Sequence, residues 1–260
     1  MTGEQVGYER RGAAAWITFE RPEVLNSLTP AMVDGLEAGL DAALADDEVK
    51  AVVISGRGRG FCVGTDLSVA LGGDEPFDLG AYLARLGAAL RRVETFPKPV
   101  IAAVNGVAVA GGIEIMLACD LVVAVESAKI GDGHANYGLV PGGGGSVRLP
   151  QRVGAARAKY LLYTGTLVPA ATLRDWGAIN EVVPDDGLEA AVAGIVEVLA
   201  TKSPLGLRRM KELVAASADL GHEEALAHEL DVVVAHTRSH DYPEGLAAFV
   251  EKRTPVFLGR

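Results

Sequence analysis

The sequence predicts an α/β fold followed by a helical segment, and three observations support this prediction. Short apolar runs typical of buried strands alternate with amphipathic helical patterns through the first 200 residues. After about Ala200 the strand signals stop, and only helical patterns follow. The chain has 260 residues, 49% of them hydrophobic, which is enough for one substantial core. We therefore predict a core over residues 1–200 and a separate helical module over residues 201–260.

The core elements are assigned from apolar periodicity and from residues that begin or end helices. Thr29 is a typical N-cap, and Pro30 suits the first position of the helix that follows it. A loop is predicted at Leu71–Pro76, which is rich in turn formers, and the glycine run at residues 142–145 is expected to begin a helix. Strands are predicted at Ala14–Phe19, Ala51–Ser55, Val100–Val104 and Leu121–Val125, and helices at Pro30–Ala45 and Leu79–Val93.

In the C-terminal module, Ser203 and Pro204 form an N-cap and first-residue pair that begins a helix. Two further helical stretches are predicted at Glu223–Ala235 and Pro243–Lys252. A run of helices after a sheet-rich core is typical of a separate packing unit.

Two glycine-rich loops follow apolar strands and are candidates for one anion site. The strand at Val100–Val104 leads to a glycine turn at Gly111, and Glu114 then lies in the first turn of a helix. Backbone N–H groups at a helix start have no partner within the helix. A second loop, Gly56–Asp66, follows the strand that begins at Ala51. One N–H from each loop can stabilise the oxygen of a thioester or enolate, so the pair predicts an oxyanion hole.

Composition excludes several classes of protein. A net charge of −10 argues against a nucleic-acid partner, since phosphate binding depends on clustered Lys and Arg. Residues 1–12 are polar and do not resemble a signal peptide, and no apolar run is long enough to cross a bilayer, so we expect a cytoplasmic protein without a membrane partner. Cys62 and Cys119 are far apart and suggest neither a disulfide nor a metal site, and nothing indicates a base that activates Cys62.

Seven segments follow one another along the chain: Glu20–Leu28, Gly60–Leu67, Lys98–Gly106, Ala110–Glu114, Cys119–Asp120, Gly138–Gly142 and Phe249–Arg253. Together they resemble the crotonase, or enoyl-CoA hydratase/isomerase, superfamily over nearly the whole chain. The resemblance implies a spiral of repeated ββα units, and C-terminal helices that assemble a homotrimer or a hexamer made of two trimers. It also implies an acyl-CoA thioester substrate and no cofactor, because coenzyme A is part of the substrate.

The resemblance also implies roles for particular residues. The backbone N–H groups of Thr65 and Gly111 match the oxyanion donors, and Glu114 matches the first of two catalytic glutamates. The family segment that matches Glu20–Leu28 lines the CoA channel, and a basic residue near the C-terminus approaches the CoA phosphates. Because CoA is anionic and so is this chain, binding requires a local basic patch. The residues predicted to contact CoA are Arg21, Val24, Arg57 and Lys252.

The chain departs from the hydratase pattern at the second glutamate, whose position is occupied by His134. Imidazole carries protons near neutral pH, but its reach and charge differ from those of a carboxylate. Asp132 is close in sequence and is a candidate to orient His134. Relatives that cleave β-diketones also have histidine here, but the aspartate they carry nine residues later falls on Gly143.

Three reactions therefore remain open. We expect an enoyl-CoA hydratase in which Glu114 orients water and His134 handles the proton of the α-carbon. One alternative is hydrolysis or C–C bond cleavage of a β-keto substrate by a Glu–His pair, and another is enoyl-CoA isomerisation with Glu114 as proton carrier. An acyl-CoA-binding protein without catalysis is disfavoured, because Glu114 and the oxyanion glycines are all present.

Overall fold

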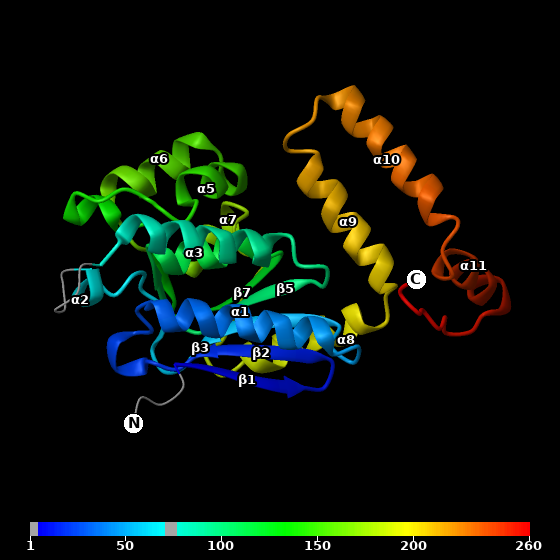
Figure 1. The fold of residues 1–260 in the computed structure, drawn as a ribbon, viewed down its shortest axis with the longest axis horizontal. Helices are drawn as coiled ribbons and strands as arrows, with labels where there is room; N and C mark the ends of the chain where they lie inside the picture. The colour runs from blue at the N-terminus through cyan, green and yellow to red at the C-terminus, as the bar shows by residue number, and fades with distance from the viewer. Residues whose placement is uncertain (1–4, 71–76) are drawn as a thin grey trace.

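A computed structural model describes residues 5–70 and 77–260, and the predicted loop over residues 71–76 lies outside this range. The described residues form two β-sheets surrounded by helices (Figure 1). The larger sheet has the strand order β1-β2-β3-β5-β7-β10, and the smaller sheet has the order β4-β6-β8-β9. The strands are β1 (Val6–Arg11), β2 (Ala14–Phe19), β3 (Ala51–Gly56), β4 (Gly60–Cys62), β5 (Val100–Val104), β6 (Val107–Val109), β7 (Leu121–Val125), β8 (Lys129–Gly131), β9 (Val168–Pro169) and β10 (Glu181–Val183).

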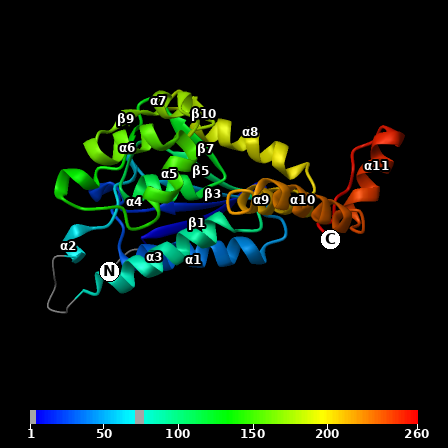
Figure 2. The same cartoon turned by 90° about the horizontal axis from the view of Figure 1, so that it is seen from above.

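Helices cover both faces of the larger sheet. Figure 2 shows α1 and α3 on one side of the strands and α8 on the other. The helices are α1 (Pro30–Ala45), α2 (Leu67–Ala70), α3 (Leu79–Glu94), α4 (Gly111–Ala118), α5 (Gly145–Val153), α6 (Ala155–Thr164), α7 (Ala170–Asp175), α8 (Leu188–Ala200), α9 (Pro204–Ala216), α10 (His222–His236) and α11 (Asp241–Glu251). Two short 3-10 helices, η1 (Pro22–Val24) and η2 (His134–Tyr137), lie in loops.

The chain repeats a strand–strand–helix unit, which confirms the predicted ββα spiral. In the pairs β3–β4, β5–β6 and β7–β8, the first strand joins the larger sheet and the second joins the smaller one. The helices that follow these pairs include α3, α4 and α5. Within each sheet the strands of successive units run parallel. Equivalent loops from successive units are therefore brought to the same edge of the smaller sheet.

Helix α1 begins and packs as its sequence predicts. The side chain of Thr29 accepts a hydrogen bond from the Met32 N–H at 3.2 Å, and Pro30 occupies the first turn. A Cβ atom at Gly35 would lie 2.7 Å from Val6, and one at Gly39 would lie 2.9 Å from Ile17. These two glycines let α1 approach β1 and β2 closely and bury the apolar face of the sheet.

The structure differs from the sequence prediction at β1, which was not predicted. Its side chains are mostly polar and exposed, because it is an edge strand that pairs only with β2, in antiparallel register. Helix α11 begins at Asp241, two residues before the predicted start at Pro243. The Asp241 carboxylate is buried and accepts the N–H groups of Leu258 and Gly259, which folds the C-terminal tail back onto the helix.

Helices α9, α10 and α11 project from one end of the core (Figures 1 and 2). An ion pair between Lys211 and Asp120, with 2.7 Å between Nζ and Oδ2, ties α9 to the core. Helix α10 contains no buried residue, and four of its large apolar side chains are exposed in the single chain: Leu226, Leu230, Val233 and Val234. No single described helix is long and apolar enough to cross a membrane, and α8 and α9 reach that length only together, across a 106° bend. The boundary between modules near residue 200 stays a prediction.

The Asp241→Ala variant is expected to lose about 1–3 kcal/mol of stability, since it leaves two backbone N–H groups without their carboxylate partner. Burial alone would raise the pKa of Asp241, but hydrogen bonds from Ser203 and the tail N–H groups outweigh it and lower that pKa. The stabilisation is therefore present above the unfolded-state pKa near 3.8 and is lost as the pH falls through the lower folded-state value. Denaturant unfolding at pH 7 measures the loss, with exposed Asp175→Ala as control. Equal stability of the two variants would contradict the role of Asp241.

Candidate active site

The carboxyl ends of three parallel strands build the candidate active site. Strands β4, β6 and β8 are neighbours in the smaller sheet and run parallel, so their carboxyl ends share one edge. Thr65 follows β4, Gly111 and Glu114 follow β6 at the start of α4, and His134 follows β8 in η2. The structure therefore brings together all four residues that the sequence assigned to catalysis or to the oxyanion hole.

Two unpaired backbone N–H groups lie next to one another at this edge. Leu28 holds the loop that carries Thr65, because its N–H donates to Gly64 O at 2.7 Å and its carbonyl accepts the Asp66 N–H at 2.9 Å. Among the described residues, neither the Thr65 N–H nor the Gly111 N–H donates to any acceptor. A Cβ atom at Gly64 would lie 3.0 Å from the Gly111 nitrogen. The loop that carries Thr65 therefore packs against the start of α4, and two N–H groups from such neighbouring segments can donate to one negatively charged oxygen.

Glu114 is a buried carboxylate held by a second glycine loop. Its side chain is 2% exposed, and Oε1 accepts the N–H groups of Gly143 and Gly145, each at 2.8 Å. Burial raises the pKa of Glu114, and the two N–H groups and the charge of His134 oppose this without cancelling it. Oε2 has no hydrogen-bond partner in the described part of the chain. The sequence had indicated the glycine run only as a helix start, and the structure adds its contact with Glu114.

His134 is oriented by Asp132, a contact that the sequence only suggested. The Asp132 carboxylate is 1% exposed and lies 2.9 Å from His134 Nδ1, and its other oxygen accepts the His134 N–H at 3.2 Å. Burial alone would lower the pKa of His134, but the hydrogen bond and charge of Asp132 and the charge of Glu114 raise it. With Nδ1 engaged by Asp132, Nε2 is the ring nitrogen left for proton transfer.

An aspartate at position 143, which the resemblance associates with cleavage of β-diketones, would crowd the Glu114 carboxylate. A Cβ atom at Gly143 would lie 2.6 Å from Glu114 Oε2 and 3.2 Å from Leu90. Any side chain there displaces the Glu114 carboxylate. The close packing at Gly143 therefore disfavours a diketone hydrolase that depends on an aspartate at this position.

Cys62 lies at the end of β4, beside the loop that carries Thr65, which we call the oxyanion loop. It is not suited to be a nucleophile. Burial raises the pKa of its thiol to about 12, so the thiol is protonated at neutral pH.

Unlike the catalytic candidates, the residues predicted to bind CoA do not all lie at one place in the structure. The Arg21 guanidinium donates to Asp66 at 2.9 Å and to the Ser27 carbonyl at 2.6 Å, so it braces the loop of residues 20–28 against the oxyanion loop. Val24 ends η1 in the same loop and is exposed. One guanidinium nitrogen of Arg21, Nη1, is therefore bonded inside the protein, whereas the exposed Val24 side chain is accessible to a ligand. Their assignment to CoA binding stays a prediction.

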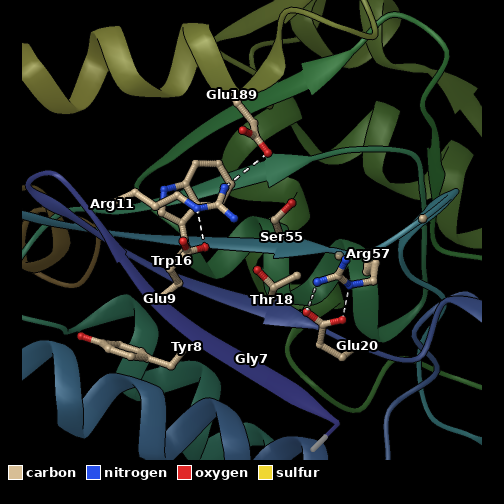
Figure 3. Close-up of a pocket in the computed structure, with 12 residues that line it drawn as sticks. Gly7, Tyr8, Glu9, Arg11, Trp16, Thr18, Glu20, Ser55, Arg57 and Glu189 are labelled. Atoms are coloured by element: carbon tan, nitrogen blue, oxygen red, sulfur yellow. Dashed lines mark hydrogen bonds and ion pairs between the residues drawn. The ribbon is translucent and has the colours of Figure 1, made fainter.

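Arg57 lies in a separate cavity that is lined by residues of β1, β2, β3 and α8 (Figure 3). This cavity has a volume of about 410 Å³. Figure 3 shows Arg57 paired with Glu20, and Arg11 between Glu9 and Glu189. Neither Glu114 nor His134 lines this cavity, so we do not assign the reacting end of a substrate to it. The role of Arg57 in CoA binding also stays a prediction.

Lys252 is remote from the catalytic residues within one chain. It is the exposed C-cap of α11, with a positive φ of 56°. Figure 2 shows α11 at the opposite end of the molecule from α2 and well away from α4. Lys252 is therefore not placed beside Glu114 within one chain, and its assignment to CoA binding stays a prediction.

Comparisons with known proteins agree with this fold. The chain matches the family Enoyl-CoA hydratase/isomerase over residues 9–260. It is 36% identical over 260 residues to a probable enoyl-CoA hydratase of Rhizobium meliloti, with full coverage of both chains. It is 37% identical over 248 residues to the 1,2-epoxyphenylacetyl-CoA isomerase of Escherichia coli, covering 94% of each. A solved enoyl-CoA hydratase from Bacillus anthracis superposes with a TM-score of 0.93 at 32% identity, covering 98% of this chain and 100% of that one.

Paired N–H donors and a buried carboxylate at the ends of parallel strands form an arrangement that is able to stabilise an enolate. The chain belongs to the enoyl-CoA hydratase/isomerase family, which confirms the predicted crotonase fold and acyl-CoA chemistry of the hydratase or isomerase type.

Proposed function

We propose that this enzyme adds water across the double bond of a 2-enoyl-CoA thioester. The observation that supports this proposal most strongly is the convergence of two free N–H groups, a buried carboxylate and an imidazole at the ends of three neighbouring strands. Hydration requires each of these parts: donors for the enolate oxygen, an acceptor that orients water and a group that carries a proton to the α-carbon.

In the proposed reaction one water proton stays on the new hydroxyl group, and His134 carries the other to C2. The Glu114 carboxylate accepts a hydrogen bond from water and aims its oxygen at C3 of the enoyl group. As that oxygen bonds to C3, His134 Nε2 takes the second water proton, and the electrons of the double bond move to the thioester oxygen. The N–H groups of Thr65 and Gly111 hold the resulting enolate. The imidazolium then returns its proton to C2, which yields the 3-hydroxyacyl thioester and regenerates neutral His134.

The environments of the two groups suit these roles. Neutral His134 is required at the start of the cycle, and Asp132 fixes its Nδ1–H so that Nε2 can accept a proton. Asp132 also stabilises the imidazolium that forms during the reaction. The proposed cycle uses only proton transfer and hydrogen bonding, so we propose no cofactor other than the coenzyme A of the substrate.

The Asp132→Asn variant is expected to shift the pH profile. Asp132 raises the pKa of His134, so its loss lowers that pKa toward or below the usual value near 6.5. The acidic limb of kcat/KM, where His134 becomes protonated, is expected to move to lower pH. The maximal rate should also fall, because the imidazolium loses its counter-ion. Rate measurements from pH 5 to 9 test this, and an acidic limb at the wild-type position would contradict the role of Asp132. Exposed Asp175→Asn is the matched control.

Product analysis in ¹⁸O-water tests the reaction itself. The enzyme is incubated with 2-enoyl-CoA and β-ketoacyl-CoA thioesters, and the products are analysed by mass spectrometry. One labelled water added to an intact enoyl thioester is the expected result. Label in a new carboxylate would show hydrolysis or C–C cleavage instead. A double bond that moves without gain of mass would show isomerisation, and no reaction with any member would favour a non-catalytic acyl-CoA-binding protein.

We propose further that the chain forms a homotrimer or hexamer through its C-terminal helices, as the resemblance implied. Large apolar side chains on α9, α10 and α11 support this, including Val214, Leu230 and Phe249, which are all exposed in the single chain. Such an assembly would also let Lys252 approach the CoA of a neighbouring subunit. The cytoplasmic location stays a prediction.

Charged residues on these helices are expected to disrupt the assembly. Light scattering should give the mass of three or six chains for the wild type and a lower mass for the Leu230→Glu and Phe249→Glu variants, because a buried carboxylate without a partner is costly. The exposed Tyr163→Glu on α6 is the control. A wild-type mass of one chain would contradict the proposal.

A further inference from the structure

The hydroxyl of Tyr82 is a buried polar group that the proposed mechanism does not use. Tyr82 is 6% exposed, and its hydroxyl has no hydrogen-bond partner among the described residues. Leaving such a group unsatisfied costs about 1–3 kcal/mol, and buried polar atoms in folded proteins are nearly always paired. The position therefore calls for a partner that comes from outside the described protein atoms.

This hydroxyl lies beside the oxyanion loop. Burial raises the pKa of Tyr82, the nearby Thr65 side chain lowers it, and the charges of Cys62 and Asp66 raise it. Thr65 approaches without forming a hydrogen bond of acceptable geometry. On the other side the Tyr82 ring contacts Phe77, with 5.4 Å between ring centroids. The hydroxyl thus lies at the loop whose main-chain N–H is available to the thioester oxygen.

The same helix also lines the loop that holds Glu114. Methyl carbons of Leu83 lie 3.2 Å from where a Cβ atom of Gly142 would be, and Leu90 lies 3.2 Å from the corresponding point at Gly143. Helix α3 therefore extends from the oxyanion loop to the carboxylate loop. The contacts of Leu83 and Leu90 with the carboxylate loop are apolar, so the Tyr82 hydroxyl is the polar group that α3 brings to the oxyanion loop.

We propose that Tyr82 is a specificity-determining residue whose hydroxyl hydrogen-bonds to an oxygen substituent on the acyl chain of the substrate. The favoured substrates are then 2-enoyl-CoA thioesters that carry a hydroxyl, carbonyl or carboxylate oxygen, rather than plain aliphatic chains. This inference rests on the proposed function for the position of the thioester. In the proposed function the thioester oxygen already has two donors, the N–H groups of Thr65 and Gly111. An oxygen substituent on the acyl chain, which has no donor assigned to it, is therefore the better acceptor for the Tyr82 hydroxyl.

The matched variant is Tyr82→Phe, which removes only the hydroxyl. In the ligand-free protein it is expected to cause no loss of thermal stability, because the hydroxyl has no partner to lose. Exposed Tyr163→Phe is the control for the substitution itself. A marked drop in melting temperature for Tyr82→Phe alone would show that the hydroxyl has a structural partner and would overturn the proposal.

The test compares six-carbon 2-enoyl-CoA thioesters that are unsubstituted, hydroxylated at C4, C5 or C6, or carboxylated at the end of the chain. For wild type, kcat/KM should be highest for one oxygen-bearing member. In Tyr82→Phe its ratio to the unsubstituted thioester should fall by roughly 5- to 100-fold, since a lost hydrogen bond to a neutral or charged group is worth about 1–3 kcal/mol. An equal loss of kcat/KM for every thioester would indicate that the hydroxyl hydrogen-bonds to the thioester oxygen. An unchanged ratio would indicate that its partner is water. Both results would overturn the proposal.

Binding separates this inference from the proposed reaction. Calorimetric titration with saturated hexanoyl-CoA and with its hydroxylated and carboxylated analogues requires no turnover. The Tyr82→Phe variant should weaken binding of one oxygen-bearing analogue selectively, even if the enzyme hydrates none of the enoyl thioesters. If hydration occurs but this selectivity is absent, the proposed function stands and the role of Tyr82 fails.

Discussion

Glu114→Gln is expected to lower kcat for hydration of a 2-enoyl-CoA by roughly 10²- to 10⁴-fold, the usual contribution of a positioned acid–base group. The amide oxygen of glutamine can still accept the N–H groups of Gly143 and Gly145, so the loop keeps its place. The amide nitrogen then replaces Oε2, and it donates hydrogen bonds where the reaction requires an acceptor for water. Loss of the enoyl-thioester absorbance with time measures the effect.

The matched control for this variant is Glu126→Gln, which changes an exposed carboxylate in the turn after β7. We expect it to retain wild-type kcat. Circular dichroism and calorimetric titration with a saturated acyl-CoA should show that Glu114→Gln is folded and binds ligand. A folded, ligand-binding Glu114→Gln enzyme with wild-type turnover would remove Glu114 from the mechanism.

The second large effect is expected at His134. The His134→Ala variant should lose roughly 10²- to 10⁴-fold in kcat, while its affinity for a saturated acyl-CoA stays close to that of the wild type. The reason is that His134 transfers a proton during the reaction and does not hold the thioester, which the Thr65 and Gly111 N–H groups bind. Rates and affinities measured on the same preparation separate the two effects.

Added imidazole provides a sharper readout for His134. Because the variant lacks only the ring, free imidazole is expected to restore part of the rate in His134→Ala and to leave the exposed control His222→Ala unchanged. Full activity without imidazole would exclude proton transfer by His134. It would instead favour a mechanism in which Glu114 alone carries the proton, as in the isomerase alternative.

Much of the fold could be predicted because its signals are local. Strands β2, β5 and β7 are continuous apolar runs and have the predicted bounds. Helix α1 carries its own start signal at Thr29 and Pro30. Strand β1 was missed because an exposed edge strand has no apolar pattern to detect. The start of α11 was misplaced because the tail that bonds to Asp241 lies 17 residues later in the chain.

The catalytic candidates were predictable, but their contacts were not. Spacing and resemblance indicated Glu114 and His134, and parallel pairing of β6 and β8 explains why they meet. The contact between Asp132 and His134 depends on the turn at Gly133, which has a φ of 72° that reverses the chain locally. The bracing of Arg21 by Asp66 joins residues 45 positions apart. The first contact depends on the backbone turn at Gly133, and the second depends on how two distant loops are placed, so residue types alone did not fix either geometry.

A crystal structure of Glu114→Gln with a bound 2-enoyl-CoA tests the central claim most directly, namely that the ends of β4, β6 and β8 form one enolate-stabilising site. The account predicts the thioester oxygen within about 3 Å of both the Thr65 and Gly111 nitrogens, since that is the normal N–H···O separation. It also predicts C3 between residue 114 and His134. A thioester bound in the cavity beside Arg57, or an oxygen that contacts neither N–H, would contradict it.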